Sequence, residues 1–277
     1  MSVAEQIRNI AAEARQASFA MARLSSKVKN ELLLDMATAL ENSAPQIIGE
    51  NLKDLAAGQQ RGLSAAMLDR LMLDEPRIKG MADAIREVAA LPDPVGEVTG
   101  MWKRPNDLMV GKMRIPLGVV GIIYESRPNV TSDAAVLCLK SGNAVVLRGG
   151  SEAIHSNLAI ATVLKAELSK RKVPEAALSL IPFTEREGVT EMLKQEEFID
   201  VIIPRGGESL IRFVVQNSKI PVIKHYKGVC HIFVDASADF EMAREIIVNA
   251  KTQRPGVCNA LETLLIQIGR ASCRERV

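Results

Sequence analysis

The sequence predicts an α/β protein in which a doubly wound parallel sheet follows a block of N-terminal helices. Residues 3–91 have the spacing of amphipathic helices, and from residue 117 onward apolar strands alternate with helices over short connections. Such alternation is typical of a parallel sheet that helices cover on both faces. Ligands of these sheets bind at the carboxyl ends of the strands, so we expect the functional site there.

The helical block has apolar residues at the 3.6-residue period. After a predicted cap at Ser25-Ser26 the apolar positions i, i+3, i+4 and i+7 are Leu33, Met36, Ala37 and Leu40, and a later set is Ala82, Ile85, Val88 and Ala89. Breaks are expected at Ser43–Pro45, Gly58, Gly62 and Pro76. We interpret the Leu and Met stripes as core packing, which gives this region a scaffold role.

The period changes after Pro92–Pro94. Residues 109–116 predict a strand of a hairpin, and residues 117–124 form a β-branched run typical of a strand buried on both faces. Further strands are expected at 144–147, 178–182, 199–203, 221–223, 230–234 and 263–267, and helices at 153–171, 188–195, 208–217 and 239–248.

The composition favours a small-molecule enzyme over several other classes. The 277 residues, 47% of them hydrophobic, suffice for one large or two ordinary domains. A net charge of +2 without a dense basic cluster argues against nucleic-acid binding. The N-terminus lacks a signal-peptide pattern, and no apolar run approaches the roughly 20 residues of a membrane span. We therefore expect a cytoplasmic protein with no membrane partner.

The cysteines and histidines do not predict a disulfide or a metal site. The chain has four Cys and three His, with no CxxC pair and no metal-ligand spacing.

Cys258 is the candidate nucleophile. It lies in the segment Asn249–Asn259, where small and turn-forming residues present a thiol between a helical stretch and an apolar strand. A thiol attacks a carbonyl carbon when it is ionised, which Lys251 and Arg254 nearby would favour. The alternative is a buried structural cysteine, since free Cys often packs as a small hydrophobe.

Two Arg-Gly-Gly turns follow predicted strands. The first turn (Arg148–Ser151) and the second turn (Pro204–Gly207) each place an arginine and two glycines before a helix. Free backbone N–H groups at a helix N-terminus, beside a guanidinium, bind phosphate well. A plain connection is the alternative for each turn alone, because neither is GxGxxG.

Four separated motifs resemble those of the gamma-glutamyl phosphate reductases, also called glutamate-5-semialdehyde dehydrogenases, within the aldehyde dehydrogenase superfamily. The motifs are Pro116–Thr131, Lys140–Gly150, Ile203–Gly207 and Asn249–Asn259. The resemblance extends from the N-terminal helices to about Gln267. It implies an aldehyde dehydrogenase-like fold, with a cofactor domain and the start of a second α/β catalytic domain.

The resemblance also implies a reaction and a cofactor. The family reduces gamma-glutamyl phosphate with NADPH to glutamate 5-semialdehyde and phosphate, in proline biosynthesis, through a thioester on the residue matched by Cys258. The implied cofactor-binding residues are Arg148, Gly149, Gly150, Ser151, Pro204, Arg205, Gly206 and Gly207. An arginine stands at position 148 and Ser151 three residues later, where the superfamily has Lys and Glu, and this suits the 2′-phosphate of NADPH.

Other roles rest on weaker matches to the superfamily. Asn129 is the candidate oxyanion donor, with capping of a turn as the alternative. Lys251 and Arg254 are candidates for holding the departing phosphate, or are solvated charges. His225–Cys230 offers no carboxylate where hydrolytic relatives carry a general base, as suits an enzyme that must spare its thioester.

The expected organisation is residues 1–228 as helices and NADP-binding domain, 229–267 as the beginning of the catalytic domain, and 268–277 as a non-native tail. A truncated fragment that binds nucleotide without turnover is the first alternative function, and a thiol acyltransferase without nicotinamide is the second. The resemblance implies a homo-oligomer for the full-length protein.

Overall fold

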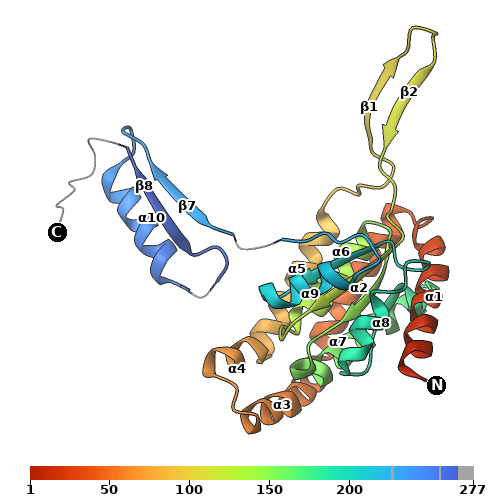
Figure 1. Cartoon of the computed structure of the whole chain (residues 1–277), viewed down its shortest axis with the longest axis horizontal. Coiled ribbons are helices and arrows are strands. Elements are labelled where there is room, and N and C mark those ends of the chain that lie inside the picture. Colours follow the sequence, from red (N-terminus) through yellow and green to blue (C-terminus); the bar gives the residue numbers. More distant parts are fainter. Residues whose placement is uncertain (226–227, 256, 268–277) are drawn as a thin grey trace. The chain divides into compact units, whose positions relative to one another are not determined.

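The computed structural model describes residues 1–225, 228–255 and 257–267, and the chain divides into two compact units (Figure 1). Unit 1 is Met1–Lys224 and unit 2 is His225–Val277. The predicted non-native tail, residues 268–277, lies outside the described residues.

Five helices make up the N-terminal block, as predicted. They are α1 (Val3–Met21), α2 (Ser26–Asn42), α3 (Ala44–Gln60), α4 (Ala65–Leu71) and α5 (Glu75–Ala90). Ser25 caps α2 by accepting the N–H of Val28 at 3.4 Å. The predicted stripe of α2, from Leu33 to Leu40, is fully buried. No helix in the described ranges is long and apolar enough to cross a membrane.

Gly58 does not end a helix, contrary to the prediction, but lies inside α3. A Cβ at this position would stand 3.0 Å from the side chain of Leu63 and 3.1 Å from that of Leu68. The glycine therefore serves close packing against the next segment.

The sheet of unit 1 has four parallel strands in the order β5-β4-β3-β6. They are β3 (Val119–Tyr124), β4 (Ala144–Arg148), β5 (Leu178–Leu180) and β6 (Val201–Arg205). The strand predicted at 221–223 is only a single bridge between Ile202 and Val222. The predicted hairpin forms separately, from β1 (Val98–Lys103) and β2 (Met109–Met113), which pair antiparallel.

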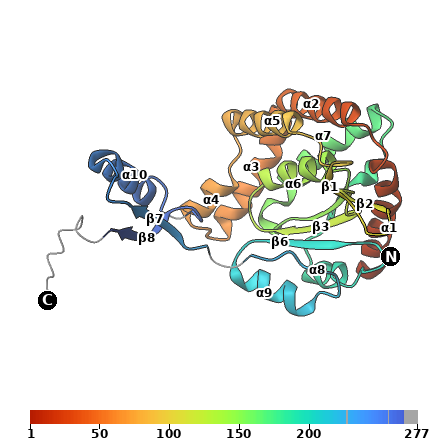
Figure 2. The ribbon, with the colours of Figure 1, turned by 90° about the horizontal axis from the view of Figure 1, so that it is seen from above.

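Helices cover both faces of this sheet, which confirms the doubly wound fold (Figure 2). Alternate residues of β3 divide between two cores: Val120 and Ile122 pack with α2, α5, α6 (Asn129–Lys140) and α7 (Ile154–Lys170). Val119 and Ile123 pack with α1, α8 (Arg186–Met192) and α9 (Glu208–Asn217). Helix α6 was not among the predicted elements.

Unit 2 is a single βαβ arrangement. Strands β7 (Cys230–Val234) and β8 (Leu261–Ile266) are parallel neighbours, and α10 (Phe240–Thr252) connects them. This matches the predicted start of a second α/β domain.

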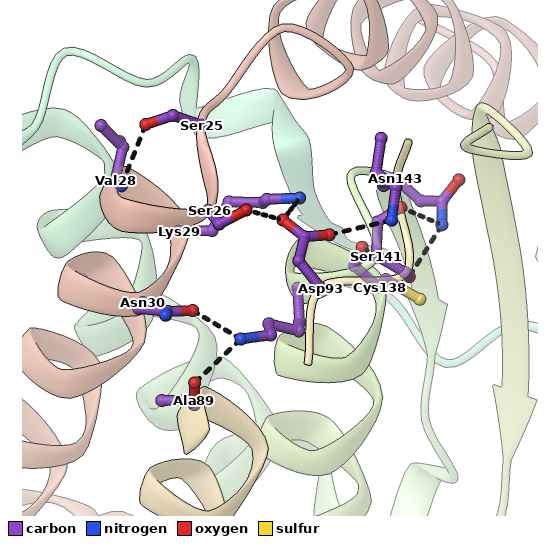
Figure 3. Close-up of polar contacts among 12 residues, drawn as sticks. Ser25, Ser26, Val28, Lys29, Asn30, Ala89, Asp93, Cys138, Ser141 and Asn143 are labelled. Atoms are coloured by element: carbon purple, nitrogen blue, oxygen red, sulfur yellow. Dashed lines mark hydrogen bonds and ion pairs between the residues drawn. The ribbon is translucent and has the colours of Figure 1, made fainter. Parts of the chain in front are cut away.

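A buried polar cluster joins α2, the end of α5 and the end of α6 (Figure 3). The ammonium of Lys29 lies 2.5 Å from the Asp93 carboxylate, and the two side chains are 1% and 10% exposed. Asp93 also accepts the hydroxyl of Ser26 at 2.6 Å and the N–H of Val95 at 3.0 Å. Burial by itself raises the pKa of Asp93, but these hydrogen bonds and the Lys29 charge outweigh it and lower the pKa below its ordinary value.

Lys140 completes the same cluster from α6. Its ammonium donates to Asn30 Oδ1 at 2.5 Å and to the carbonyl of Ala89 at 2.8 Å. Burial lowers the pKa of Lys140, and the charge of Asp93 opposes this effect. The cluster thus connects three helices at one edge of the core.

Replacing Asp93 by asparagine tests this cluster through its pH dependence. Asp93→Asn leaves the Lys29 ammonium buried without a carboxylate, so we expect a loss of about 3–5 kcal/mol of unfolding free energy near neutral pH. Because the folded pKa is depressed, the carboxylate's contribution is present above the ordinary value of 3.8 and is lost as the pH falls through the folded pKa. The difference in unfolding free energy between Asp93→Asn and the wild type therefore becomes smaller in acid. Urea unfolding followed by circular dichroism measures it.

Asp83→Asn is the matched control, since Asp83 lies in α5 and pairs with Lys79 and Arg86 at the exposed surface of the helix. Its cost is expected to stay within about 1 kcal/mol. An Asp93→Asn penalty of the same size in acid as at neutral pH would contradict the assigned ion pair.

Candidate functional site

The carboxyl ends of β3, β4 and β6 lie together because the three strands pair in register. Ile123 lies opposite both Arg148 of β4 and Pro204 of β6, and Tyr124 lies opposite Arg205. The first and second Arg-Gly-Gly turns, separated by more than fifty residues in sequence, therefore leave the sheet on either side of β3.

Residues 125–126, which follow β3, occupy the space between the two turns. A Cβ at Gly150 would stand 3.2 Å from the backbone nitrogen of Ser126, and one at Gly206 would stand 2.5 Å from the carboxyl carbon of Glu125. The backbone of Ser126 leaves little room for a side chain at position 150, whereas a side chain at position 206 would require the Glu125 side chain to move. The structure brings together the cofactor candidates of both turns.

A buried chain of hydrogen bonds lies against the first turn. The hydroxyl of Tyr124 lies 2.7 Å from Thr131 Oγ1, which donates to Asn157 Oδ1 at 2.9 Å. Asn157 Nδ2 then faces Gly149, where a Cβ would stand only 2.2 Å away. Burial raises the pKa of Tyr124, so it stays a neutral donor at the base of the site.

Two buried side-chain nitrogens lack a hydrogen-bond partner among the described residues, one in this turn and one in α7 next to it. They are Arg148 Nε and Asn157 Nδ2. The other guanidinium nitrogens of Arg148 donate to the carbonyls of Gly149 at 3.0 Å and Thr184 at 2.9 Å. Burial lowers the pKa of Arg148, and the charges of nearby acids oppose this only in part. A partly buried cation with a donor left over favours an anionic ligand.

The helix N-termini differ from the expectation of free N–H groups. Asp54 of α3, which is 2% exposed, accepts the N–H of His155 at 3.2 Å, the N–H of Ser156 at 2.8 Å and the Ser156 hydroxyl at 2.6 Å. The first turn of α7 is therefore already satisfied by the protein's own carboxylate. At α9 the N–H of Gly207 donates to Glu125 Oε2 at 3.0 Å.

Cys258 lies in unit 2, exposed on the loop between α10 and β8. Its backbone carbonyl accepts the thiol of Cys230 at 3.3 Å. Lys251 donates to the carbonyl of Leu261 at 2.9 Å, which joins the end of α10 to the start of β8. Arg254 is exposed on the same loop.

Asn129 is the first residue of α6 in unit 1. Its amide donates to Asp133 Oδ2 at 2.9 Å, one helical turn further on. Burial raises the pKa of Asp133, and the bond from Asn129 lowers it in part. The candidate oxyanion donor thus has an acidic partner within its own helix.

Sequence reasoning missed four polar residues of these sites: Glu125, Asp54, Asn157 and Cys230. Position 125 directly follows a predicted strand, which is a usable signal, whereas the partners of the others are far away in sequence. In the described ranges no three His, Cys, Asp or Glu side chains are grouped to hold a metal. Residues 226–227 of the predicted base-free segment lie outside the described residues.

Comparison with known proteins gives consistent similarities. The model of the aldehyde dehydrogenase family matches residues 1–273. Gamma-glutamyl phosphate reductase of Geobacter sp. is 89% identical over 266 residues, which is 96% of this chain and 64% of that protein. The protein of the same name from Geobacter metallireducens is 76% identical over the same shares of both chains. This chain thus spans 64% of the length of these relatives.

Solved structures show the same fold. The gamma-glutamyl phosphate reductase of Thermotoga maritima has a TM-score of 0.86 at 42% identity, covering 94% of this chain and 63% of that chain. An acetylating aldehyde dehydrogenase from Geobacillus thermoglucosidasius, at 18% identity, has a TM-score of 0.68 over 95% of this chain and 55% of that chain. The second likeness bears on the fold alone.

Gly149→Ala tests the close approach in the first turn. The added methyl meets the fully buried Asn157 amide, so we expect a loss of about 1–3 kcal/mol of unfolding free energy in urea. Gly207→Ala is the matched control, because a Cβ there meets nothing nearer than 3.7 Å. Equal losses in the two variants would show that Asn157 does not constrain the turn.

Proposed function

Because the chain belongs to the aldehyde dehydrogenase family, we propose that it carries the cofactor site and the nucleophile of an NADPH-dependent gamma-glutamyl phosphate reductase. The proposed reaction turns gamma-glutamyl phosphate into glutamate 5-semialdehyde and phosphate. The observation that carries the proposal is the junction of two Arg-Gly-Gly turns across one strand end, and the names of relatives at 76% to 89% identity agree with it.

The two turns fit a dinucleotide phosphate by two features of their residues. At Gly149, Gly150 and Gly206 other groups of the protein come within 2.6 Å of the place where a Cβ would stand, so no side chain covers the backbone at these positions. Arg148 Nε is a buried donor without a partner among the described residues. Arg148 would hold the 2′-phosphate, with Gly150 and Ser151 beside it, while Arg205 to Gly207 would hold the pyrophosphate. Pro204 pairs with Ile123 and fixes the start of the second turn. When bound, NADPH supplies the hydride for the reduction.

Cys258 is the proposed nucleophile. Its thiolate attacks the acyl carbon of the acyl phosphate, the carbon–oxygen bond to phosphate breaks, and a thioester remains on the sulfur. Reduction of the thioester gives a thiohemiacetal, whose collapse releases the aldehyde and regenerates the thiolate. Dividing the reaction into acyl transfer and reduction lowers each barrier.

Residues around the nucleophile have proposed supporting roles. Lys251 donates one of its three N–H groups to Leu261, which leaves two for the departing phosphate beside the exposed Arg254. Asn129 and the backbone N–H of Cys258 are the proposed donors to the substrate carbonyl oxygen. The full-length protein is proposed to act as a homo-oligomer.

Cys258→Ala tests the nucleophile. The experiment joins this chain to the part of the 89% identical Geobacter sp. relative that lies outside the match, since this chain spans 64% of that protein. We expect phosphate-dependent oxidation of glutamate 5-semialdehyde, the reverse reaction, to fall by at least about a thousandfold, with the Kd for NADPH within about twofold.

Cys138→Ala is the control, because Cys138 is buried in the core of unit 1 and the variant should keep its activity. Activity surviving in Cys258→Ala would remove this thiol from the mechanism. The unextended 277-residue chain, assayed in parallel, separates a working enzyme from a fragment that only binds nucleotide.

Arg148→Gln tests the choice of cofactor. Charged hydrogen bonds contribute about 1.5–3 kcal/mol, so we expect the Kd for NADPH to rise roughly ten- to a hundredfold and that for NADH by less than about twofold. Arg186→Gln on α8, an exposed charge of the same sign, should change neither constant. Equal weakening of NADPH and NADH binding would contradict a 2′-phosphate contact. Intrinsic fluorescence or calorimetric titration provides the measurement.

A further inference from the structure

The carboxylate of Glu125 lies where the second Arg-Gly-Gly turn would receive a phosphate. Its Oε2 accepts the N–H of Gly207 at 3.0 Å, and the side chain packs so closely on Gly206 that a Cβ there would stand 2.5 Å from the carboxyl carbon. Gly207 is the N-cap of α9 and has no side chain to bond the first turn of the helix. A residue that follows β3 therefore places a negative charge at this helix end, in addition to that of Glu208 in the first turn of α9.

The contact can be released without disturbing the sheet. The backbone of Glu125 is fixed separately, since its N–H donates to the carbonyl of Arg205 at 3.2 Å and its carbonyl accepts the N–H of Arg127 at 2.6 Å. Glu125 is exposed, and among the described residues it forms no ion pair. Rotation of the side chain thus breaks one hydrogen bond and returns the carboxylate to water.

A second acid next to the first turn is arranged differently. Glu152 Oε2 accepts the hydroxyl of Ser126 at 3.1 Å, so its hydrogen-bonding partner is a side chain and not a glycine N–H. Glu125 is therefore the acid whose bond competes for the backbone donors of the second turn.

We propose that the Glu125 carboxylate occupies the position of the cofactor's pyrophosphate while no cofactor is bound. There it holds the second Arg-Gly-Gly turn in its binding conformation, and it must leave before the phosphate binds. The inference rests on the proposed function. The Glu125 carboxylate and the cofactor's phosphate are both negatively charged and cannot share one N–H donor. Binding of the cofactor therefore requires displacement of the carboxylate, and the cost of that displacement weakens the affinity for the cofactor. The same competition speeds release of the oxidised cofactor, because the carboxylate returns as the phosphate leaves.

Removal of this carboxylate tests the proposal by binding alone. NADPH is titrated into the 277-residue chain and its variants, with the Kd read from nucleotide fluorescence and the dissociation rate from stopped-flow dilution. Glu125→Ala empties the position, so we expect the Kd to fall about three- to tenfold and dissociation to slow by a similar factor. Glu125→Gln keeps the acceptor and the shape without the charge, and we expect a smaller decrease of the Kd.

Glu208→Gln is the matched control, since Glu208 is the first residue of α9 and pairs with Arg212 at 2.6 Å. It removes the same charge from the same helical turn without touching Gly207, so its Kd should stay within about twofold of the wild type. Thermal unfolding of each variant verifies folding, and Glu125→Gln retains the cap if Glu125→Ala loses stability.

The outcomes separate this inference from the proposed function. If the wild type binds NADPH and both Glu125→Ala and Glu125→Gln bind it with equal or lower affinity, the inference is overturned and the proposed function is not. A lower affinity in these variants would make Glu125 a ligand of the cofactor. An equal decrease of the Kd for NADPH in Glu208→Gln also overturns the inference, because general charge repulsion would then explain the tighter binding. No NADPH binding by the wild type or by either variant overturns the proposed function and this inference with it.

Discussion

The parallel register of β3 with its two neighbours is the constraint on which the site depends. Backbone hydrogen bonds fix Ile123 opposite both Arg148 and Pro204, so the three strands end at the same level. Two turns that lie far apart in sequence thereby become one surface. A shift of one residue would point every side chain of β3 to the opposite face and exchange the two cores, which makes the register expensive to change.

At these strand ends three glycines allow other groups of the protein to approach the backbone closely, and buried polar groups lie next to them. The chain from Tyr124 through Thr131 to Asn157 supports Gly149, and Asp54 satisfies the first turn of α7 from another helix. These groups are hydrogen-bonded before any ligand arrives, so little reorganisation is needed on binding. Arg148 Nε and Asn157 Nδ2 are the exceptions among the described residues, and a free donor on a partly buried cation is a feature of binding more than of folding.

The sequence predicted the elements whose periodicity is regular and missed those whose character depends on distant partners. Buried β-branched runs identified β3, β4 and β6, and the glycine turns after two of them identified the candidate cofactor residues. Helix α6 escaped because it is buried around most of its circumference and shows no polar face, while Thr131, Ser132 and Asp133 resemble a loop. The acids at the helix N-termini, Asp54 and Glu125, were missed because the N–H groups that donate to them lie about 100 and 80 residues away. Placement of Cys258 on a loop between helix and strand followed from local sequence, whereas its contact with Cys230 needed the fold.

Amide hydrogen exchange with and without NADPH tests whether both Arg-Gly-Gly turns form a single phosphate-binding surface. We expect exchange at the amides of Gly149 to Ser151 and of Gly206 to Gly207 to slow together at one NADPH concentration, while exchange in the β1–β2 hairpin does not change. Protection of one turn alone, or of neither, would contradict a single surface.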